Sequence, residues 1–343
     1  MSEQSFYDTV IIGAGPAGLA VANRLQKDNI NCLVVERKFI GYNISRFPVG
    51  MTFFSSRELL EIDNFALTIP DEKPNREQYM SYLFHFASKR KINIVDNTEV
   101  LSLKKANDIF KISIQQNNKS LNTSSAKTVV CACGAFDEPQ QLNVPAENLS
   151  HVSHFFNEVY RYIGHSVMIV GSGNSAVEAA LKLHRVGARV NVSYRKPALN
   201  SNKIKYWIYP DIEKRFTTHE IGHFPSTKVK KIEPGKLILE KTLETSNKTD
   251  RSHLKDIELQ ADFVLALTGY NPPIAFLKDM GIQINDLNYV PTYNPDTLET
   301  NVEGLFIAGV ITGGNISGKV FIENSRHHGD LIVGQIHKIL KEG

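Results

Sequence analysis

The chain has 343 residues, of which 42% are hydrophobic and 22% charged, so it can bury sizeable cores in roughly two domains. Its 39 Lys and Arg residues nearly balance 36 Asp and Glu residues, and the net charge of +3 gives no reason to expect a nucleic acid or a membrane as partner. The N-terminal residues show no signal peptide, no apolar run is long enough to span a membrane, and three cysteines are too few for a disulfide framework. These features predict a two-domain cytoplasmic protein.

The first predicted elements are a strand, a glycine-rich turn and a helix within residues 10–25. The turn reads Gly13-Ala14-Gly15-Pro16-Ala17-Gly18 and has G-x-G-x-x-G spacing. In this motif the first glycine allows a tight turn, the second lets the backbone approach a pyrophosphate, and the third lets the helix pack closely on the strand. The next predicted strand, at 31–38, contains Glu36, whose carboxylate can accept hydrogen bonds from a ribose 2′-hydroxyl. The pattern predicts a dinucleotide site.

A helix is predicted over residues 76–89, with Asn75 as its cap. Strand-like segments follow at 99–104, 109–114 and 128–131, and the polar residues 115–125 are predicted to form a turn.

The strand–turn–helix pattern recurs at residues 167–183, with the turn Gly171-Ser172-Gly173-Asn174-Ser175-Ala176. Ala176 takes the place of the third glycine, which is an allowed variant. The following strand ends at Arg195 and Lys196 instead of an acidic residue. Because basic side chains attract a 2′-phosphate that a carboxylate would repel, this second site is predicted to bind NADP(H).

Each half closes on a further related strand, within 129–136 and within 264–271. A hairpin around Pro234-Gly235 is predicted from strands at 229–232 and 236–243, then a surface loop at 244–255 and a final helix at 325–341. The predicted fold is α/β, with two Rossmann-like dinucleotide-binding domains. Each domain is expected to have three layers in the order ββα. The second domain, 141–275, is inserted into the first, which comprises 1–140 and the return segment 276–343.

Two different dinucleotide sites on one chain imply electron transfer between cofactors. The arrangement resembles the two-dinucleotide-binding-domain flavoproteins, with FAD at the first site and NADPH at the second. Thioredoxin reductases are similar in size and domain order, but residues 151–157 lack their C-x-x-C pair, and Val310 stands where they have Asp. A narrower resemblance, to the bacillithiol-disulfide-reductase-like flavoproteins, rests on five segments: 51–61, 152–155, 206–210, 308–310 and 321–324.

This resemblance implies a homo-oligomeric, NADPH-dependent FAD oxidoreductase that reduces a low-molecular-weight thiol disulfide. The FAD-binding residues that it and the first motif indicate are Gly13, Gly15, Pro16, Ala17, Gly18, Glu36, Arg37, Met51, Thr52, Val100, Cys133, Gly134, Gly309, Val310 and Glu323. Those indicated for NADP(H) are Gly171, Gly173, Asn174, Ser175, Ala176, Arg195, Lys196 and Gly269. Thr52 and His328 are candidates for a role in catalysis. No metal site is predicted, since the adjacent His327 and His328 would point apart on a helix.

Members of the bacillithiol-disulfide-reductase-like family commonly carry a cysteine in the first glycine loop, at the position that is Ala17 here. Cys32, Cys131 and Cys133 lie in apolar strand-like segments, and we interpret them as core residues. The reduced flavin would then act on the disulfide without a protein thiol.

Three alternatives are compatible with the same motifs. A flavin-dependent monooxygenase would require F-x-G-x-x-x-H-x-x-x-aromatic before the second loop, of which only the tail from His151 to Phe155 is present. A ferredoxin or flavodoxin reductase has the same domain order and needs no cysteine. A non-enzymatic redox sensor would bind both nucleotides without turnover.

Overall fold

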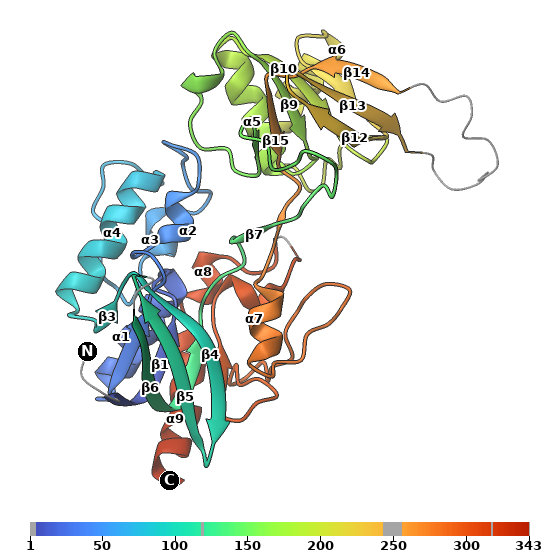
Figure 1. Cartoon of the computed structure of the whole chain (residues 1–343). Helices are drawn as coiled ribbons and strands as arrows, with labels where there is room; N and C mark the ends of the chain where they lie inside the picture. The colour runs from blue at the N-terminus through green and yellow to red at the C-terminus, as the bar shows by residue number, and fades with distance from the viewer. Residues whose placement is uncertain (1–4, 118–119, 243–255, 317, 343) are drawn as a thin grey trace. The chain divides into compact units, whose positions relative to one another are not determined.

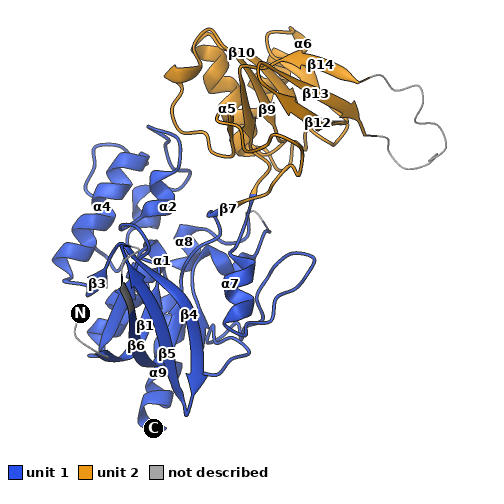
Figure 2. Ribbon diagram, in the orientation of Figure 1, with its two compact units in different colours: residues 1–138, 270–343 blue, residues 139–269 orange. Residues whose placement is uncertain are grey.

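The computed structural model describes residues 5–117, 120–242, 256–316 and 318–342. The chain divides into two compact units (Figure 2). The first comprises residues 1–138 and 270–343, and the second is the continuous segment 139–269. The boundaries expected from the sequence, 140/141 and 275/276, fall close to these in the chain.

The first unit is built on a sheet whose central strands are parallel (Figure 1). These strands, in spatial order, are β3 (Ile94–Val95), β2 (Cys32–Val35), β1 (Ser5–Ile12), β6 (Ser120–Cys131) and β17 (Leu305–Ile307). Side chains alternate between the two faces, so Ile11 packs with the helices while Val10 and Ile12 pack on the opposite side. Both faces are therefore buried, as parallel sheets require.

Helices cover one face of this sheet. The long ones are α1 (Pro16–Lys27), α4 (Arg76–Lys89) and α9 (His328–Glu342), and the short ones on this face are α2 (Tyr42–Ser45), α3 (Arg57–Leu60) and α8 (Ile322–Ser325). The short helix α7 (Ile274–Asp279) and the 3₁₀ helix η2 (Val310–Gly313) pack on the opposite face. The predicted start of α4 is confirmed, because Asn75 and Gln78 form a reciprocal capping box. The C-terminal helix expected at 325–341 is confirmed as α9, which begins at His328, because Arg326 and His327 separate it from α8.

An antiparallel meander covers the other face, formed by β4 (Thr98–Ala106), β5 (Ile109–Gln116) and the first half of β6. Strand β6 pairs with β5 in its first half and with β1 and β17 in its second, so one strand belongs to both sheets. The turn predicted at 115–125 is wrong, since most of that segment is strand. Its polar residues suit an antiparallel strand with one face in solvent, and polar composition alone does not separate such a strand from a turn.

The second unit repeats this plan. Its parallel sheet has the order β11 (Gly222–Phe224), β10 (Arg189–Ser193), β9 (Ser166–Val170), β15 (Phe263–Ala266) and β8 (Val152–Ser153). Val167 and Ile169 pack with helices α5 (Asn174–Arg185) and α6 (Tyr209–Thr217), near the 3₁₀ helix η1 (Tyr160–Tyr162). Met168 and Val170 face a meander of β12 (Thr227–Glu233), β13 (Lys236–Lys241) and β14 (Ile257–Gln260).

The hairpin predicted at Pro234-Gly235 is confirmed, whereas β14 was not predicted. The loop expected at 244–255 and the end of the second hairpin strand at Leu243 lie outside the described residues. Two short strands, β7 (Glu138–Pro139) and β16 (Tyr270–Asn271), form a separate sheet.

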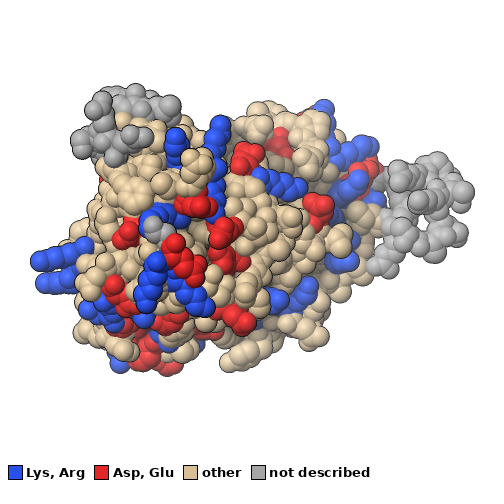
Figure 3. All heavy atoms as spheres, turned by 90° about the horizontal axis from the view of Figure 1, so that it is seen from below, with Lys and Arg blue, Asp and Glu red and all other residues tan. Residues whose placement is uncertain are grey.

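The predicted fold class is confirmed: two Rossmann-like domains of helix, parallel sheet and meander, the second inserted into the first. Positive and negative side chains are interspersed over the face drawn in Figure 3. No helix within the described ranges is both long and apolar enough to cross a membrane.

Candidate functional site

The first glycine loop joins β1 to α1, and each of its glycines has a separate structural reason. Gly13 has a φ of +107°, and a Cβ there would lie 2.6 Å from the Ala132 carbonyl oxygen. A Cβ on Gly18 would lie 2.0 Å from the Gly13 carbonyl oxygen. Around Gly15, in contrast, a Cβ would meet nothing within 4 Å. The first and third glycines are therefore required by the fold, while the second faces open space at the start of a helix.

Helix α1 begins at Pro16 with Gly15 as N-cap, and no side chain caps it. Its first amide groups and the positive end of the helix dipole are therefore free to bind an anion. Because open space lies over Gly15, a pyrophosphate fits there.

Glu36 follows β2 and lies beside this loop. Its carboxylate accepts hydrogen bonds from the backbone N–H of Ala14 at 2.8 Å and of Lys38 at 2.9 Å. Burial raises the pKa of Glu36, and the two amide hydrogen bonds act in the opposite direction. The neighbouring Arg37 forms an ion pair with Asp137 at 3.0 Å, which anchors the segment after β6 to the end of β2.

Gly134 and Cys133 follow β6 and form another wall of the same region. A Cβ on Gly134 would lie 3.3 Å from the Asn43 Nδ2 atom, and Asn43 belongs to the short helix α2. Its other side-chain atom, Oδ1, is buried and accepts no hydrogen bond from the part of the chain that the structure describes. Such an orphaned acceptor indicates a donor from a bound molecule or water. Asn43 was not predicted as a site residue, because its neighbours in the sequence do not distinguish it from an ordinary helical asparagine.

Val100 lies near the start of β4 and is 7% exposed, within the core between the meander and the main sheet. The start of β4 nevertheless contacts the residue beside the first loop, because the Thr98 N–H donates to the Glu36 carbonyl at 2.9 Å.

The C-terminal motif meets the first loop at position 17. A Cβ on Gly309 would lie 2.8 Å from the Ala17 Cβ, and Gly309 has a φ of +88°. The Gly309 N–H donates to Nδ1 of His328, the first residue of α9, at 3.1 Å. Burial lowers the pKa of His328 to about 4, so its imidazole is neutral near pH 7 and can accept this bond. Val310 begins the 3₁₀ helix η2 directly after Gly309.

Two other predicted segments are also brought together. The hydroxyl of Ser55 donates to a carboxylate oxygen of Glu323. The Arg326 guanidinium donates to the carbonyls of Glu58 at 2.6 Å and Glu61 at 2.8 Å. These bonds fasten the 55–61 segment to the turn between α8 and α9.

Met51 and Thr52 lie just before the 55–61 segment, in the first unit. The Met51 carbonyl accepts from the Arg76 N–H at 2.9 Å, and Thr52 forms an antiparallel bridge with Asn75. Thr52 itself is exposed.

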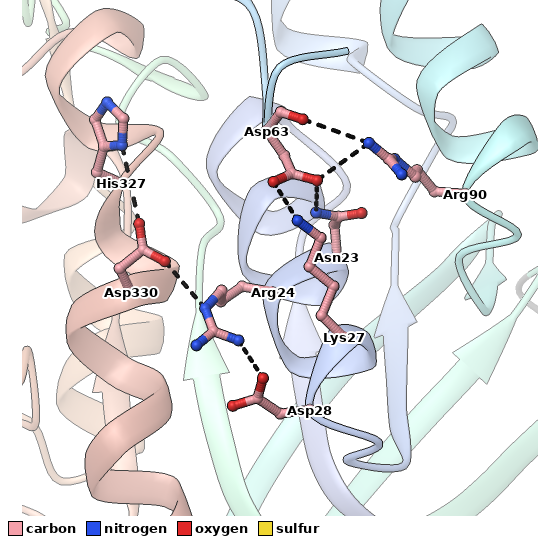
Figure 4. A network of polar contacts seen from close by, with 8 residues as sticks. All are labelled: Asn23, Arg24, Lys27, Asp28, Asp63, Arg90, His327 and Asp330. Carbon is pink, nitrogen blue, oxygen red and sulfur yellow. Dashed lines mark hydrogen bonds and ion pairs between the residues drawn. The ribbon is translucent and has the colours of Figure 1, made fainter.

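A network of ion pairs fixes the outer side of α1 (Figure 4). Asp63 contacts Asn23, Lys27 and Arg90, and Arg24 pairs with Asp330 of α9 at 3.0 Å. A cavity of about 250 Å³ lies among these groups. The network connects α1 with the loop at 61–64 and with α9.

The second glycine loop, in the other unit, reproduces the first. A Cβ on Gly171 would lie 2.3 Å from the Leu267 carbonyl oxygen, and one on Gly173 would meet nothing within 4 Å. Helix α5 has Gly173 as its N-cap and no side-chain cap. Ser175 is exposed, and Ala176 is buried in place of the third glycine. Gly269 follows β15 with a φ of +105°, and its carbonyl accepts from the Gln140 N–H at 2.9 Å.

The Asn174 side chain binds the backbone of a neighbouring segment, and its predicted contact with NADP(H) stays a prediction. Its Oδ1 accepts from the Lys205 N–H at 2.8 Å, and its Nδ2 donates to the Lys203 carbonyl at 3.1 Å. Both ends of the amide therefore hold the 203–205 segment over the start of α5, and Asn174 positions this segment.

Arg195 and Lys196 are exposed, just after the carboxyl end of β10. Gly171 follows the neighbouring strand β9, with its N–H donating to the Ser193 carbonyl at 3.0 Å, so the basic pair and the glycine loop share one edge of the sheet. The Ser226 N–H and the Thr242 hydroxyl donate to the carbonyls of Lys196 and Arg195 at 2.9 and 3.1 Å. The backbone of the basic pair is thus held in place, while its side chains are exposed among the described residues.

Both regions fit an adenine dinucleotide, on three observations in the structure. Each loop has open space over its second glycine, each helix starts without a side-chain cap, and the first region has an orphaned acceptor at Asn43. The first carries a carboxylate at the end of its second strand, and the second carries two basic side chains there.

The sequence profile described as pyridine nucleotide-disulphide oxidoreductase matches residues 10–309. The chain belongs to this family. It is 37% identical over 331 residues to the bacilliredoxin reductase Bdr of Bacillus subtilis, covering 96% of this chain and 97% of the relative.

Solved structures agree with this assignment. Bacillithiol disulfide reductase Bdr from Bacillus cereus superposes with a TM-score of 0.91 at 37% identity, covering 97% of this chain and 99% of that one. The Staphylococcus aureus protein of the same name gives 0.89 at 31% identity, covering 99% and 100%. The resemblance to bacillithiol-disulfide-reductase-like, thioredoxin-reductase-like flavoproteins is confirmed, and the chain is an oxidoreductase of this class.

Proposed function

We propose that this protein is an FAD-containing oxidoreductase that takes electrons from NADPH and reduces a low-molecular-weight thiol disulfide. The likeness to Bdr over nearly the whole chain supports the disulfide, since the relatives are named for bacillithiol disulfide and bacilliredoxin. Bacillithiol disulfide is therefore the first acceptor to test.

The first unit supplies the residues that would hold FAD. The amide groups at the start of α1 bind the pyrophosphate over Gly15, and the Glu36 carboxylate accepts from the ribose. Asn43 and Gly134 line the adjoining wall, and Gly309 and Val310 extend the site toward Ala17.

The second unit supplies the residues that would hold NADPH. The start of α5 binds the pyrophosphate over Gly173, and Arg195 and Lys196 select the 2′-phosphate by charge-assisted hydrogen bonds. Since their side chains are exposed, the selection depends on their position after β10.

When bound, the nicotinamide and the flavin supply hydride and electron transfer, and the overall reaction is NADPH + H⁺ + RSSR → NADP⁺ + 2 RSH. The protein binds and orients the two groups. No thiol stands at position 17, where the neighbouring atoms belong to Gly309, so this loop forms no mixed disulfide with the acceptor. His328 stays neutral and holds the Gly309 amide. Homo-oligomerisation and a cytoplasmic location stay predictions.

The deciding experiment is anaerobic reduction with NADPH followed by rapid mixing with bacillithiol disulfide, oxygen, ferredoxin or flavodoxin. We expect NADPH to bleach the flavin absorbance faster than NADH, and the disulfide to restore it fastest. Fast reoxidation by oxygen would indicate a monooxygenase, and fast reoxidation by ferredoxin or flavodoxin would indicate the corresponding reductase. Either result would overturn the proposed acceptor.

A further inference from the structure

Two thiols lie in contact at the end of β6. The Sγ atoms of Cys131 and Cys133 are 3.5 Å apart. Cys131 is the last residue of the strand and is completely buried, whereas Cys133 lies beyond the strand and is partly exposed. Cys131 and Cys133 belong to the same apolar cluster, so their side chains lie on one side of the chain.

This arrangement is close to that of a disulfide. A disulfide has an S–S length of about 2.05 Å, and its Cα atoms are usually about 4.4–6.8 Å apart. The Cα atoms of Cys131 and Cys133 are at most roughly 7 Å apart, because a single residue separates them. The sulfur atoms, at 3.5 Å, must still approach to the bonded length, and the thiols already hold much of the proximity that ring closure requires.

The residues around this pair also form the candidate FAD site. A Cβ on Gly13 would lie 3.2 Å from the Cys133 Cα, and the Ala132 N–H donates to the Ile12 carbonyl at 2.8 Å. Gly134 follows directly, against Asn43. A shift of Cys133 toward Cys131 therefore moves backbone that borders the first glycine loop.

We propose that Cys131 and Cys133 form a reversible intramolecular disulfide when a low-molecular-weight disulfide is in excess, and that its formation weakens FAD binding. In the first step the more exposed Cys133 thiolate attacks RSSR, forming a mixed disulfide and releasing one thiolate RS⁻. In the second step the Cys131 thiolate attacks the Cys133 sulfur, forming the internal bond and releasing the second RS⁻. The protein loses two protons and two electrons, and RSSR takes up both as 2 RSH.

The local environment makes this reaction slow. The hydrogen bond with Cys131, followed by burial, raises the pKa of Cys133 well above its ordinary value, and the Asp137 carboxylate acts in the same direction. Arg37 and Arg46 both pair with Asp137 and reduce that effect. The thiolate is scarce near pH 7, so the pair responds to prolonged oxidation and takes no part in turnover. The coupling to FAD rests on the proposed function, whereas the formation of the disulfide does not.

The test uses the flavin-loaded enzyme without NADPH, incubated with excess oxidised glutathione, alkylated and analysed by peptide mass spectrometry. We expect the peptide containing both cysteines to lose the mass of two hydrogens and to escape alkylation, and dithiothreitol to reverse both changes. After oxidation, loss of flavin during ultrafiltration should become several-fold faster. Cys32→Ser is the matched control and should behave as wild type, because Cys32 lies in β2 against the Ala22 carbonyl.

Cys131→Ala should stop at a glutathione adduct on Cys133. Cys133→Thr should remain unmodified, and its own rate of flavin loss should be the same with and without oxidant. A persistent adduct on Cys133 of the wild type, or no modification at all, would overturn the internal disulfide. Disulfide formation with unchanged flavin retention would overturn the coupling. Failure of the enzyme to reduce any disulfide with NADPH would bear only on the proposed function, because the mass measurement needs no turnover.

Discussion

The methyl group of Ala17 packs against the backbone of Gly309, so that the second residue of α1 closes directly onto the C-terminal motif. Ala17 is 9% exposed at this contact. The position at which the sequence resemblance implies a cysteine therefore lies against Gly309 in this chain, and it holds no reactive group.

Replacing Ala17 by cysteine should restore that group. A thiol at the start of a helix has a lowered pKa and is more reactive. We expect Ala17→Cys to increase the rate of disulfide reduction at saturating NADPH and to leave quinone reduction nearly unchanged. Ala17→Ser, of similar size, is the control; equal rates for the two variants would show that a thiol at this position is not used.

The two open glycines provide a matched pair of variants. Gly15 and Gly173 both have extended backbone, with φ of −81° and −92°, and a side chain at either meets nothing within 4 Å. Valine should therefore fold at both positions but fill the space of the pyrophosphate. We expect Gly15→Val to purify colourless, and Gly173→Val to purify yellow but resist reduction by NADPH. Flavin absorbance and circular dichroism check both results; a yellow Gly15→Val protein would contradict the FAD assignment.

Arg195 should determine nucleotide preference. Hydrogen bonds to charged groups are worth about 1.5–3 kcal/mol, so Arg195→Ala should raise the Michaelis constant for NADPH by about 10- to 100-fold. The constant for NADH should change little. Lys230→Ala, which removes an exposed basic residue from β12, is the control. Equal effects on both nucleotides would remove Arg195 from the 2′-phosphate site.

His328 should make stability depend on pH. Its pKa is about 4 in the folded protein and 6.5 as the ordinary value, so the unfolded chain binds the proton more tightly between these limits. The contribution of this group is fully present above pH 6.5 and is lost as the pH falls toward 4, on the order of 3 kcal/mol in total. Urea unfolding at pH 7.5 and pH 5 should show a smaller loss for His328→Gln than for wild type. The charge of His327 is the second cause of the lowered His328 pKa, after burial, so His327→Gln should reduce the wild-type difference less than His328→Gln does.

The cysteines should be dispensable for electron transfer to an artificial acceptor. We expect the triple variant Cys32→Ser, Cys131→Ala and Cys133→Thr to keep NADPH oxidation with a quinone, measured by absorbance at saturating quinone. It should also keep disulfide reduction. If quinone turnover is normal but disulfide reduction is lost, one of these thiols lies on the electron path.

The glycine loops could be predicted from the sequence because their rules are local. Gly13 and Gly171 each have a positive φ and lie close to one carbonyl, so only glycine fits there. Glycines at these fixed positions of the motif can be recognised in the sequence. The capping box of Asn75 and Gln78 is local for the same reason. Membership of the family could also be predicted, because it depends on several short sequence segments along the chain.

The parts that could not be predicted depend on contacts distant in sequence. The bond between Ser55 and Glu323, the orphaned oxygen of Asn43 and the contact of the Cys131 and Cys133 sulfurs appear only when the chain is folded. The bonds from the Asn174 side chain to the backbone of Lys203 and Lys205 likewise could not be predicted from its place in the glycine loop. Residue type and spacing do not reveal which partner a polar side chain selects.

Strand β6 has a consequence for the order in which the protein is made. Its second half pairs with β17, which the ribosome produces only after the entire inserted unit, residues 139–269. Until then one edge of the parallel sheet lacks its neighbour, and α1 lacks α9, with which it packs. The inserted unit has all its strands on one continuous segment, so it can fold before the first unit is complete. The candidate FAD site, which includes Gly309 beside His328, is therefore completed last. A chain released early exposes the apolar surface that β17 and α9 cover.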